Sequence, residues 1–482
     1  MSFLMIQRII GILLMIFSFC MLPPIAIGWL MDDVELSPFW SGFIIVFLTG
    51  LCLWLPVYRV RQDLRLRDGF LIAVLFWTIL SAAATIPLLL SNALDLNLAS
   101  AVFETVSGFT TSGGTVIMGL DGLPKSILFY RVELHWLGGM GVLVLAVAIL
   151  PMLGIGGMQL YKAEAPGPVK DEKLTPRITE TAKLLWYIYL IMTVIATICY
   201  KLAGMDWFDA VCHAFSAIAT GGFTNHDSGM GFYNNPVIDY LTTFFILMAG
   251  VNFSLYFIFW RNKNLKTFFS DSEFRTYFSV YLLFTLAAVI FLWKANTYTT
   301  LEETVRYALL HMASFMTSSG FISADLSTWP VVVPILMIFS SVIGACAGST
   351  GGGMKVIRVL LLMKQGAREI NQLAHPKAQL LIKVNHRPVP EAVIKAVWGF
   401  AAMYVALYAI FMIGMMAAGY DQITAFSAVA ACLNNMGAGI GGIISNFAGL
   451  SDFAKWWLSL AMIMGRLELF TVLALFSPMF WR

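Results

Sequence analysis

The feature that most constrains this sequence is a short segment that occurs four times in one frame. In each copy an alanine begins an apolar run, a small residue follows six positions later, and a glycine ends the segment six positions after that. Each copy is too short to cross a bilayer and lies between two apolar runs that are long enough to do so. We therefore expect four re-entrant segments around one axis. The alanine, small residue and glycine of the four copies are Ala101, Ser107 and Gly113; Ala210, Ser216 and Gly222; Ala308, Ser314 and Gly320; Ala425, Ala431 and Gly437.

The composition places the chain in a membrane. Of its 482 residues 59% are hydrophobic and only 12% are charged, whereas a soluble domain carries about 25% charged residues. The six cysteines are scattered without CxxC spacing, which favours neither a disulfide framework nor a metal site. The apolar N-terminus approaches spanning length and has no evident small-residue cleavage site, so we interpret it as a first transmembrane helix and not as a signal peptide.

Hydropathy predicts ten spanning helices, and the loops between them alternate in charge. One set of loops contains the four re-entrant segments and several acids, and the other set is rich in lysine and arginine. By the positive-inside rule the basic loops and both termini are cytoplasmic, and the re-entrant segments enter from outside. The predicted spans are residues 9–30, 39–58, 69–92, 125–153, 182–203, 236–260, 276–294, 330–362, 391–418 and 454–479.

The predicted fold is an all-α polytopic membrane protein with four parallel helix, re-entrant loop, helix repeats around a central pore. Two extra transmembrane helices precede the first repeat. A shared orientation of the repeats argues against the inverted repeats of many secondary transporters. Two proline-containing cytoplasmic segments, 155–181 and 363–390, are either linkers for a partner or ordinary solvated connections. The expected units are residues 1–68 for the two extra helices, then 69–175, 176–272, 273–388 and 389–482 for the repeats.

The ends of the four segments suggest a cation-binding ring. Backbone carbonyls that converge from four strands can replace the hydration shell of a potassium ion without adding formal charge. Glycine allows the dihedrals that turn carbonyls to one side, and each short helix directs its partially negative end at the ion. The competing interpretation is that glycine-rich loops merely pack helices together. The candidate potassium-binding residues are Thr110, Thr111, Ser112 and Gly113; Ala219, Thr220, Gly221 and Gly222; Thr317, Ser318, Ser319 and Gly320; Asn434, Asn435, Met436 and Gly437.

Three further motifs carry a family resemblance over essentially the whole chain. They are His135–Gly141 (HWLGGMG), Gly348–Lys355 (GSTGGGMK) and Gly465–Glu468 (GRLE). With the four segments they resemble the TrkH/TrkG/KtrB superfamily, and within it the TrkH subunits of bacterial Trk potassium uptake systems. The resemblance implies potassium as the transported ion and a homodimer in the inner membrane. It also implies a cytoplasmic TrkA-like ring that binds NAD(H), ATP and ADP, so that nucleotide is expected only on that partner.

The resemblance also bears on ion selectivity. The fourth segment departs from the TxGY-like pattern of potassium channels, and the other three lack its tyrosine. We therefore expect modest selectivity among potassium, rubidium and sodium.

The predicted span 330–362 has an unusual middle. Ala347 to Gly352 are six consecutive small or hydroxyl residues, which form helices poorly. Unwound backbone at membrane depth is tolerated only where it lines a cavity or is buried in protein, so we expect an intramembrane loop that gates the pore. Close helix packing through small residues is the alternative. A phosphate-binding loop is set aside because the GxxxxGK[ST] order is missing. The gate candidates are Gly344, Gly348, Gly351, Gly352, Lys355 and Arg466.

Arg466 lies near the middle of the last predicted span, where a charge costs about 2.5–3.5 kcal/mol on insertion scales. We expect Arg466 to project into the pore and to raise the barrier for cations, with Lys355 nearby; the alternative is an ion pair with an acid such as Glu133. Glu468 is expected to point to another side of the helix. Arg131, Glu133 and His135 are interpreted as interhelical braces.

Two function classes stay in view. The leading one is gated potassium conduction, and the alternative is a potassium cotransporter coupled to protons or sodium. Coupling would need carboxylates inside the spans, for which Glu133 and Glu468 are the main candidates. An intramembrane enzyme lacks an HExxH motif or a partnered nucleophile, and no basic face supports nucleic-acid binding.

Overall fold

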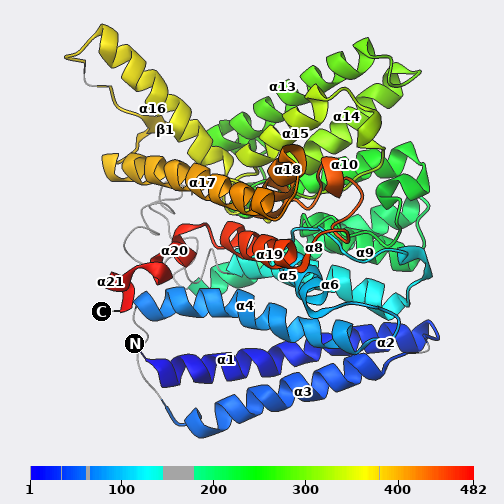
Figure 1. The fold of residues 1–482 in the computed structure, drawn as a ribbon. Coiled ribbons are helices and arrows are strands. Elements are labelled where there is room, and N and C mark those ends of the chain that lie inside the picture. Colours follow the sequence, from blue (N-terminus) through cyan, green and yellow to red (C-terminus); the bar gives the residue numbers. More distant parts are fainter. Residues whose placement is uncertain (1, 34, 61–65, 145–177, 379, 482) are drawn as a thin grey trace.

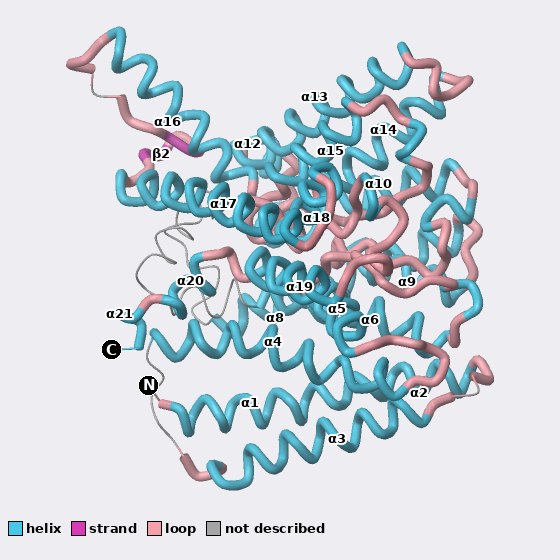
Figure 2. Tube along the Cα trace, viewed as in Figure 1, coloured by secondary structure: helices cyan, strands magenta, loops and turns pink. Residues whose placement is uncertain are grey.

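The fold is a bundle of helices around loops that meet in its interior. The computed structural model describes residues 2–33, 35–60, 66–144, 178–378 and 380–481. Within these residues the only strands are β1 (Lys383–Val384) and β2 (Arg387–Pro388), which form a small antiparallel hairpin. The predicted all-α class is therefore confirmed apart from this hairpin. Figure 2 shows that loops gather between α5, α9, α10 and α18, near the centre of the bundle.

Two antiparallel helical segments precede the repeats. The first consists of α1 (Phe3–Ser18) and α2 (Leu22–Leu30), joined by a short 3-10 turn, and the second is α3 (Ser37–Trp54). They lie along one edge of the molecule (Figure 1). The two segments cross closely at Gly11 and Gly50, where a Cβ on either glycine would lie 2.8 Å from the carbonyl oxygen of the other. The glycines thus allow backbone contact between α1 and α3.

Each repeat contains a long helix, a short helix, a loop and a second helix. The long helices span the bundle and the short ones end in its interior (Figure 1). Repeat 1 contains α4 (Leu66–Leu90), α5 (Leu98–Phe109) and α6 (Lys125–Val144). Repeat 2 contains α8 (Ile178–Leu202), α9 (Trp207–Ile218), α10 (Pro236–Ala249), α11 (Phe253–Asn262) and α12 (Lys266–Ser270). Repeat 3 contains α13 (Ser272–Lys294), α14 (Leu301–Met316), α15 (Val332–Ile343) and α16 (Val356–Ala374). Repeat 4 contains α17 (Glu391–Ala417), α18 (Gln422–Leu433), α19 (Asp452–Arg466), α20 (Phe470–Phe476) and α21 (Pro478–Trp481).

The four short helices begin in the same way. In each, a polar side chain caps the helix by accepting a hydrogen bond from the backbone N–H three residues later, which satisfies a donor that has no partner inside the helix. The cap residues are Asn97, Asp206, Thr300 and Asp421. Because the caps recur in all four repeats, the start of each short helix is encoded locally.

The second helices of repeats 2 and 4 are bent, which the prediction of ten spans did not include. Within the described residues six helices are long and apolar enough to cross a membrane, or eight if two bent pairs count as spans. The predicted span 236–260 bends by 90° between α10 and α11, and the predicted span 454–479 bends by 114° between α19 and α20. Neither of these two bends was predicted from the sequence. The end of the predicted span 125–153 lies outside the described residues.

Local backbone chemistry explains both bends. Asn252 accepts a hydrogen bond from Ser254 N and so starts α11 as a new helix. Glu468 and Leu469 have φ values of 55° and 45°, which end α19. The interruption predicted in the span 330–362 is present, because α15 ends at Ile343 and α16 begins at Val356.

Both ends of the chain approach the start of α4. Ser2 N donates to Asp68 Oδ1 at 3.3 Å, and Arg67 Nη1 donates to the carbonyl oxygen of Phe480 at 3.4 Å. The beginning of α1 and the C-terminal α21 accordingly lie on the same side of the bundle (Figure 1).

Gly50→Ala should destabilise the protein by about 1–3 kcal/mol, the usual cost of overpacking, because the new Cβ would lie 2.8 Å from Gly11 O. The thermal unfolding midpoint in detergent measures the effect. Gly366→Ala in α16 is the control, since a Cβ there meets nothing within 4 Å and alanine favours a helix by about 0.8–1.0 kcal/mol. Equal midpoints for the two variants would contradict the close crossing of α1 and α3.

Candidate functional site

The four loops that follow the short helices form a closed ring. In each loop the final glycine lies against the backbone of the next loop, so closely that a Cβ would come within about 2 Å of a carbonyl oxygen. The fourth loop returns to the first, so the contacts run once around an axis. The pairs are Gly113 with Gly221 O (2.0 Å), Gly222 with Ser319 O (1.9 Å), Gly320 with Met436 O (2.0 Å) and Gly437 with Ser112 O (2.1 Å).

The four loops also share the same backbone dihedral angles at two positions. The second of the four final residues has a φ between 52° and 58° in every copy, and the glycine two positions later has a φ between 72° and 88°. Positive φ is unfavourable for residues other than glycine, by roughly 1–2 kcal/mol each. The surrounding structure therefore imposes this conformation on Thr111, Thr220, Ser318 and Asn435.

N–H groups of the loops donate hydrogen bonds to backbone carbonyls of the short helices. Ser112 N donates to Ser107 O at 2.8 Å, and equivalent bonds of 2.7–2.8 Å run to Ser216, Ser314 and Ala431. These acceptors are the small residues at the middle of the repeated frame. Their carbonyls bind the loop N–H groups, which leaves the loop carbonyls to meet other ligands.

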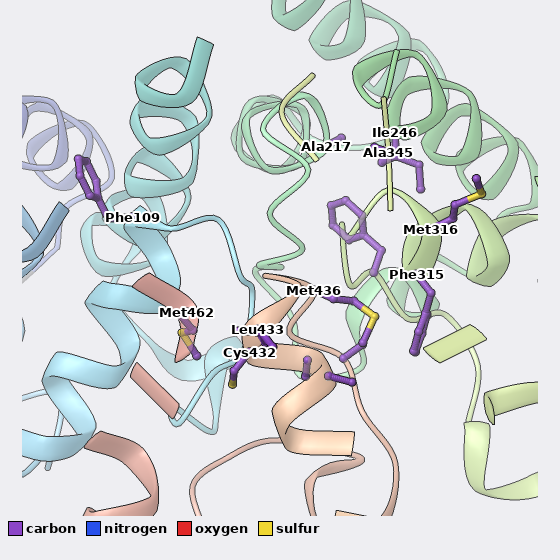
Figure 3. Packing of buried hydrophobic residues seen from close by; sticks show 14 of the residues in the cluster. Phe109, Ala217, Ile246, Phe315, Met316, Ala345, Cys432, Leu433, Met436 and Met462 are labelled. Atoms are coloured by element: carbon purple, nitrogen blue, oxygen red, sulfur yellow. The ribbon is translucent and has the colours of Figure 1, made fainter. Parts of the chain in front are cut away.

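Apolar side chains hold the inner ends of the short helices. Phe109, Ala217, Phe315 and Leu433, one from the end of each short helix, belong to one buried hydrophobic cluster and are labelled in Figure 3. All four are at most 2% exposed. This packing directs four helix C-termini, with their partial negative charge, toward the ring.

A large cavity opens on one side of the ring. It has a volume of about 750 Å³, and Gly113, Gly222, Gly320 and Gly437 all line it together with the loops that leave them. The sequence predicted that these four glycines share a central cavity, and the structure brings them together there.

The interrupted segment of repeat 3 lies against the other side of the ring. Gly352 N donates to Ser318 Oγ, and a Cβ on Gly352 would lie 2.0 Å from Asn434 O. Thr350 Oγ1 donates to Ile218 O at 3.1 Å. The segment from Gly344 to Lys355, called the intramembrane loop below, thus contacts the final loops of repeats 3 and 4 and the end of the short helix of repeat 2.

Neighbouring helices hold the intramembrane loop in place. Cys346 N donates to Gly250 O and Phe253 N donates to Gly348 O, both at 3.0 Å. These two bonds pair the loop with the bend between α10 and α11. Ala347 N donates to Glu273 Oε1 at 2.7 Å. The bend that the sequence did not predict is therefore one of the anchors of this loop.

Arg466 contacts the intramembrane loop directly. It is the last residue of α19, so its expected place in the middle of an unbroken helix was wrong. Its Nη1 donates to Thr350 O at 2.9 Å and its Nη2 to Gly138 O at 3.4 Å, and these bonds replace the alternative ion pair with Glu133. Lys355 Nζ donates to Gly351 O. Both cations line a cavity of about 40 Å³ below the ring.

Sequence reasoning missed one ion pair beside this cavity. Arg358 Nη2 lies 2.7 Å from Glu468 Oε2 and links the start of α16 to the bend after α19. Glu468 was expected to point away from Arg466, and no periodicity connects it with Arg358, 110 positions earlier. The ion pair joins the two interrupted helices of repeats 3 and 4.

Arg131 and His135 brace helices as predicted, although the partner of Arg131 was not foreseen. Arg131 Nε lies 2.8 Å from Glu104 Oε1 on α5, and both side chains are 1% exposed. Glu104 also accepts a hydrogen bond from Val116 N at 2.8 Å. His135 stacks on Phe223 with 4.1 Å between ring centroids. The Arg131–Glu104 pair therefore fixes the chain that leaves the first loop.

Glu104→Gln should cost about 3–5 kcal/mol of stability, because it leaves the buried guanidinium of Arg131 without a counter-charge. The midpoint of thermal unfolding in detergent measures the loss. Arg368→Ala is the matched control: the Arg368–Glu391 pair is 14% and 56% exposed, and exposed pairs contribute about 0–1 kcal/mol. Similar midpoints for the two variants would show that the buried pair is dispensable.

These features define a class of protein: a polytopic membrane protein whose single chain supplies four loops to one central ring. The sequence matches the TrkH family, described as cation transport proteins, over residues 36–482. The chain belongs to this family.

Individual relatives agree along the full length. The chain is 48% identical over 487 residues to the Trk system potassium uptake protein TrkH of Halomonas elongata, and 44% identical over 482 residues to the Escherichia coli K12 protein of the same name. Both comparisons cover all of each chain. The crystal structure of the potassium transporter TrkH from Vibrio parahaemolyticus superimposes with a TM-score of 0.93 at 46% identity, again over all of both chains.

Proposed function

We propose that this protein takes up potassium across the bacterial inner membrane through the ring of four loops, which acts as a selectivity filter. The closed set of glycine-to-carbonyl contacts carries the proposal, because it holds carbonyls of four loops around one axis. Such carbonyls can replace the water around a monovalent cation. The relatives named as potassium uptake proteins support the choice of ion.

The proposed potassium ligands are the backbone carbonyls of the four final residues in each loop, Thr110–Gly113, Ala219–Gly222, Thr317–Gly320 and Asn434–Gly437. The N–H groups at the third position donate to carbonyls of the short helices. Two of the proposed ligand carbonyls also accept a side-chain hydrogen bond, Ala219 O from Thr220 Oγ1 at 2.7 Å and Thr317 O from Ser318 Oγ at 2.6 Å. The side chain of Asn435 is used otherwise, because its Nδ2 donates to Ser112 Oγ and to Met462 O. It braces the fourth loop against the first.

The intramembrane loop is the proposed gate. It lies against the inner side of the ring, and Arg466 and Lys355 add two positive charges beside it. A cation that leaves the ring on this side meets both a steric obstacle and a positive potential. Gly344, Gly348 and Gly353 have positive φ, from 71° to 78°, so these glycines give the loop its present conformation.

The proposed topology places both termini in the cytoplasm and the 750 Å³ cavity outside. The chain would then act as a homodimer with a TrkA-like cytoplasmic ring that binds NAD(H), ATP and ADP; the Trk system named for the relatives supports a regulatory partner. The proposed division of the chain into the two extra helices and the four repeats remains 1–68, 69–175, 176–272, 273–388 and 389–482.

The outer surface of the bundle is suited to contact with membrane lipid. Apolar side chains are exposed there on α13, for example Leu283 and Leu286.

Coupled transport is the second candidate, and Glu133 is the observation that favours it. Its Oε2 is buried and makes no hydrogen bond within the described residues, so this carboxyl is available to hold a proton. Glu468, by contrast, is paired with Arg358. Reversal potentials of the purified protein in liposomes separate the two functions. A reversal potential that follows potassium alone supports conduction, and one that shifts with the proton or sodium gradient supports coupling.

Gly113→Ala should reduce rubidium uptake into liposomes by roughly tenfold or more, since each 1.4 kcal/mol of added barrier is a factor of ten. The new Cβ would meet Gly221 O at 2.0 Å. Gly119→Ala is the control: its φ of 71° is close to the 81° of Gly113, but a Cβ there meets nothing within 4 Å. Equal uptake by the two variants would contradict the filter assignment.

Arg466→Ala should increase rubidium uptake, because it removes a positive charge beside the exit and frees Thr350 O. Uptake into liposomes under a fixed rubidium gradient measures the change. Arg466→Lys keeps the charge but not the two-pronged guanidinium, so its uptake should lie between those of the wild type and the alanine variant. Unchanged or reduced uptake in Arg466→Ala would rule out a barrier role for this residue.

A further inference from the structure

A charged cluster joins repeats 1 and 2 at the rim of the outer cavity. The ring of His226, which lines this cavity, lies between two carboxylates: its Nδ1 is 2.5 Å from Asp121 Oδ1, and its Nε2 is 3.0 Å from Asp209 Oδ2. Asp121 belongs to the loop between α5 and α6, and Asp209 to the first turn of α9. His226 therefore bridges two repeats.

The geometry favours a charged imidazolium. A neutral imidazole has one N–H and can donate to only one of the two carboxylates, whereas the protonated ring donates to both. The hydrogen bond from His226 holds the pKa of Asp121 below its ordinary value, so Asp121 is ionised in this arrangement.

The two carboxylates are held unequally. Asp209 Oδ2 also accepts a hydrogen bond from Tyr233 Oη at 2.7 Å, and Asp209 Oδ1 accepts one from Asn225 Nδ2 at 2.8 Å. The side chain of Asp121 is 51% exposed. When the ring loses a proton, the bond to Asp121 is therefore the one that breaks.

Further contacts tie the same two loops together. Gly119 N donates to Asp227 Oδ1 at 3.0 Å, and Asp227 N donates to Asp121 Oδ2 at 3.4 Å. The ring of His226 stacks on Phe232 with 3.5 Å between centroids. These bonds end on exposed groups, so the charged His226 side chain is the buried link between the loops.

We propose that His226 is a proton-binding site that clamps the outer rims of repeats 1 and 2 together and sets the charge of the cavity mouth. Protonated His226 offsets the carboxylates of Asp121, Asp209 and Asp227. Loss of the proton releases the clamp on Asp121 and makes the mouth more negative by one charge. This effect on cation entry rests on the proposed function, whereas the proton site itself does not.

The other titratable groups of the cluster set its limits. His213 Nδ1 donates to the backbone oxygen Asp209 O at 2.8 Å, and its ring faces the ring of Tyr233 edge-on. Asp206 caps the same helix. The clamp holds where Asp121 is ionised and His226 is protonated. It is lost in acid, as pH falls through the lowered pKa of Asp121, and it requires the proton on His226.

Nuclear magnetic resonance of ring-labelled histidine in the purified protein tests the proton site without any transport measurement. The His226 signal is identified by its loss in His226→Gln. It should titrate, and Asp121→Asn should move its midpoint to lower pH, because one stabilising carboxylate is gone. A His226 ring that keeps one protonation state from about pH 5 to 9, or a midpoint that Asp121→Asn leaves unchanged, would overturn the proposal.

Rubidium uptake into liposomes tests the effect on entry. At low rubidium and low salt, wild-type uptake should rise about twofold or more as external pH is raised through the histidine titration, and high salt should reduce this rise. His226→Asn should remove the pH dependence. His386→Asn is the control, since His386 lies in the exposed turn between β1 and β2. A flat wild-type profile, or one retained in His226→Asn, would refute the effect on entry.

If the wild-type protein does not carry rubidium at all, the proposed function fails, whereas the resonance titration still decides the proton site.

Discussion

The structure depends on a backbone contact that repeats four times: a carbonyl oxygen of each loop lies where the preceding loop has only the hydrogen of a glycine. At Gly113, Gly222, Gly320 and Gly437 any larger residue would overlap that oxygen. The contact fixes the spacing of the four loops without using a single side chain. Their other positions can therefore vary, from Thr110 in the first loop to Asn434 in the fourth, while the ring remains closed.

The helices and side chains around the ring hold the loops in the positions that this contact requires. Capped short helices set where each loop begins, and their buried ends fix its direction. The buried Arg131–Glu104 pair holds the chain that leaves the first loop. On the inner side the second helices of repeats 2 to 4 are interrupted, which makes room for the intramembrane loop. The closed ring of loops and the interrupted helices that lie against it therefore belong to the same packing arrangement.

Repeats and residue runs in the sequence predicted the ring and one of the interrupted helices. Four in-frame copies indicated the ring, and the run of small residues from Ala347 to Gly352 indicated the interruption in repeat 3. The bends near Gly250 and Leu467 were missed because hydropathy averages along an apolar run and does not register a change of direction. The capping residue Asn252 was an available signal. Pairs such as Arg358 with Glu468, and Arg466 with the carbonyl of Thr350, join distant segments and leave no trace in local sequence.

The four repeats belong to one polypeptide, so the four quadrants around the ring need not be alike. In an assembly of four identical chains, any obstruction would appear in every quadrant at once. Here the intramembrane loop belongs to repeat 3 alone, and Arg466, which contacts it, belongs to repeat 4. Because each quadrant has its own sequence, a segment that contacts the ring from one side can come from a single quadrant, while the opposite quadrant contributes only its own loop.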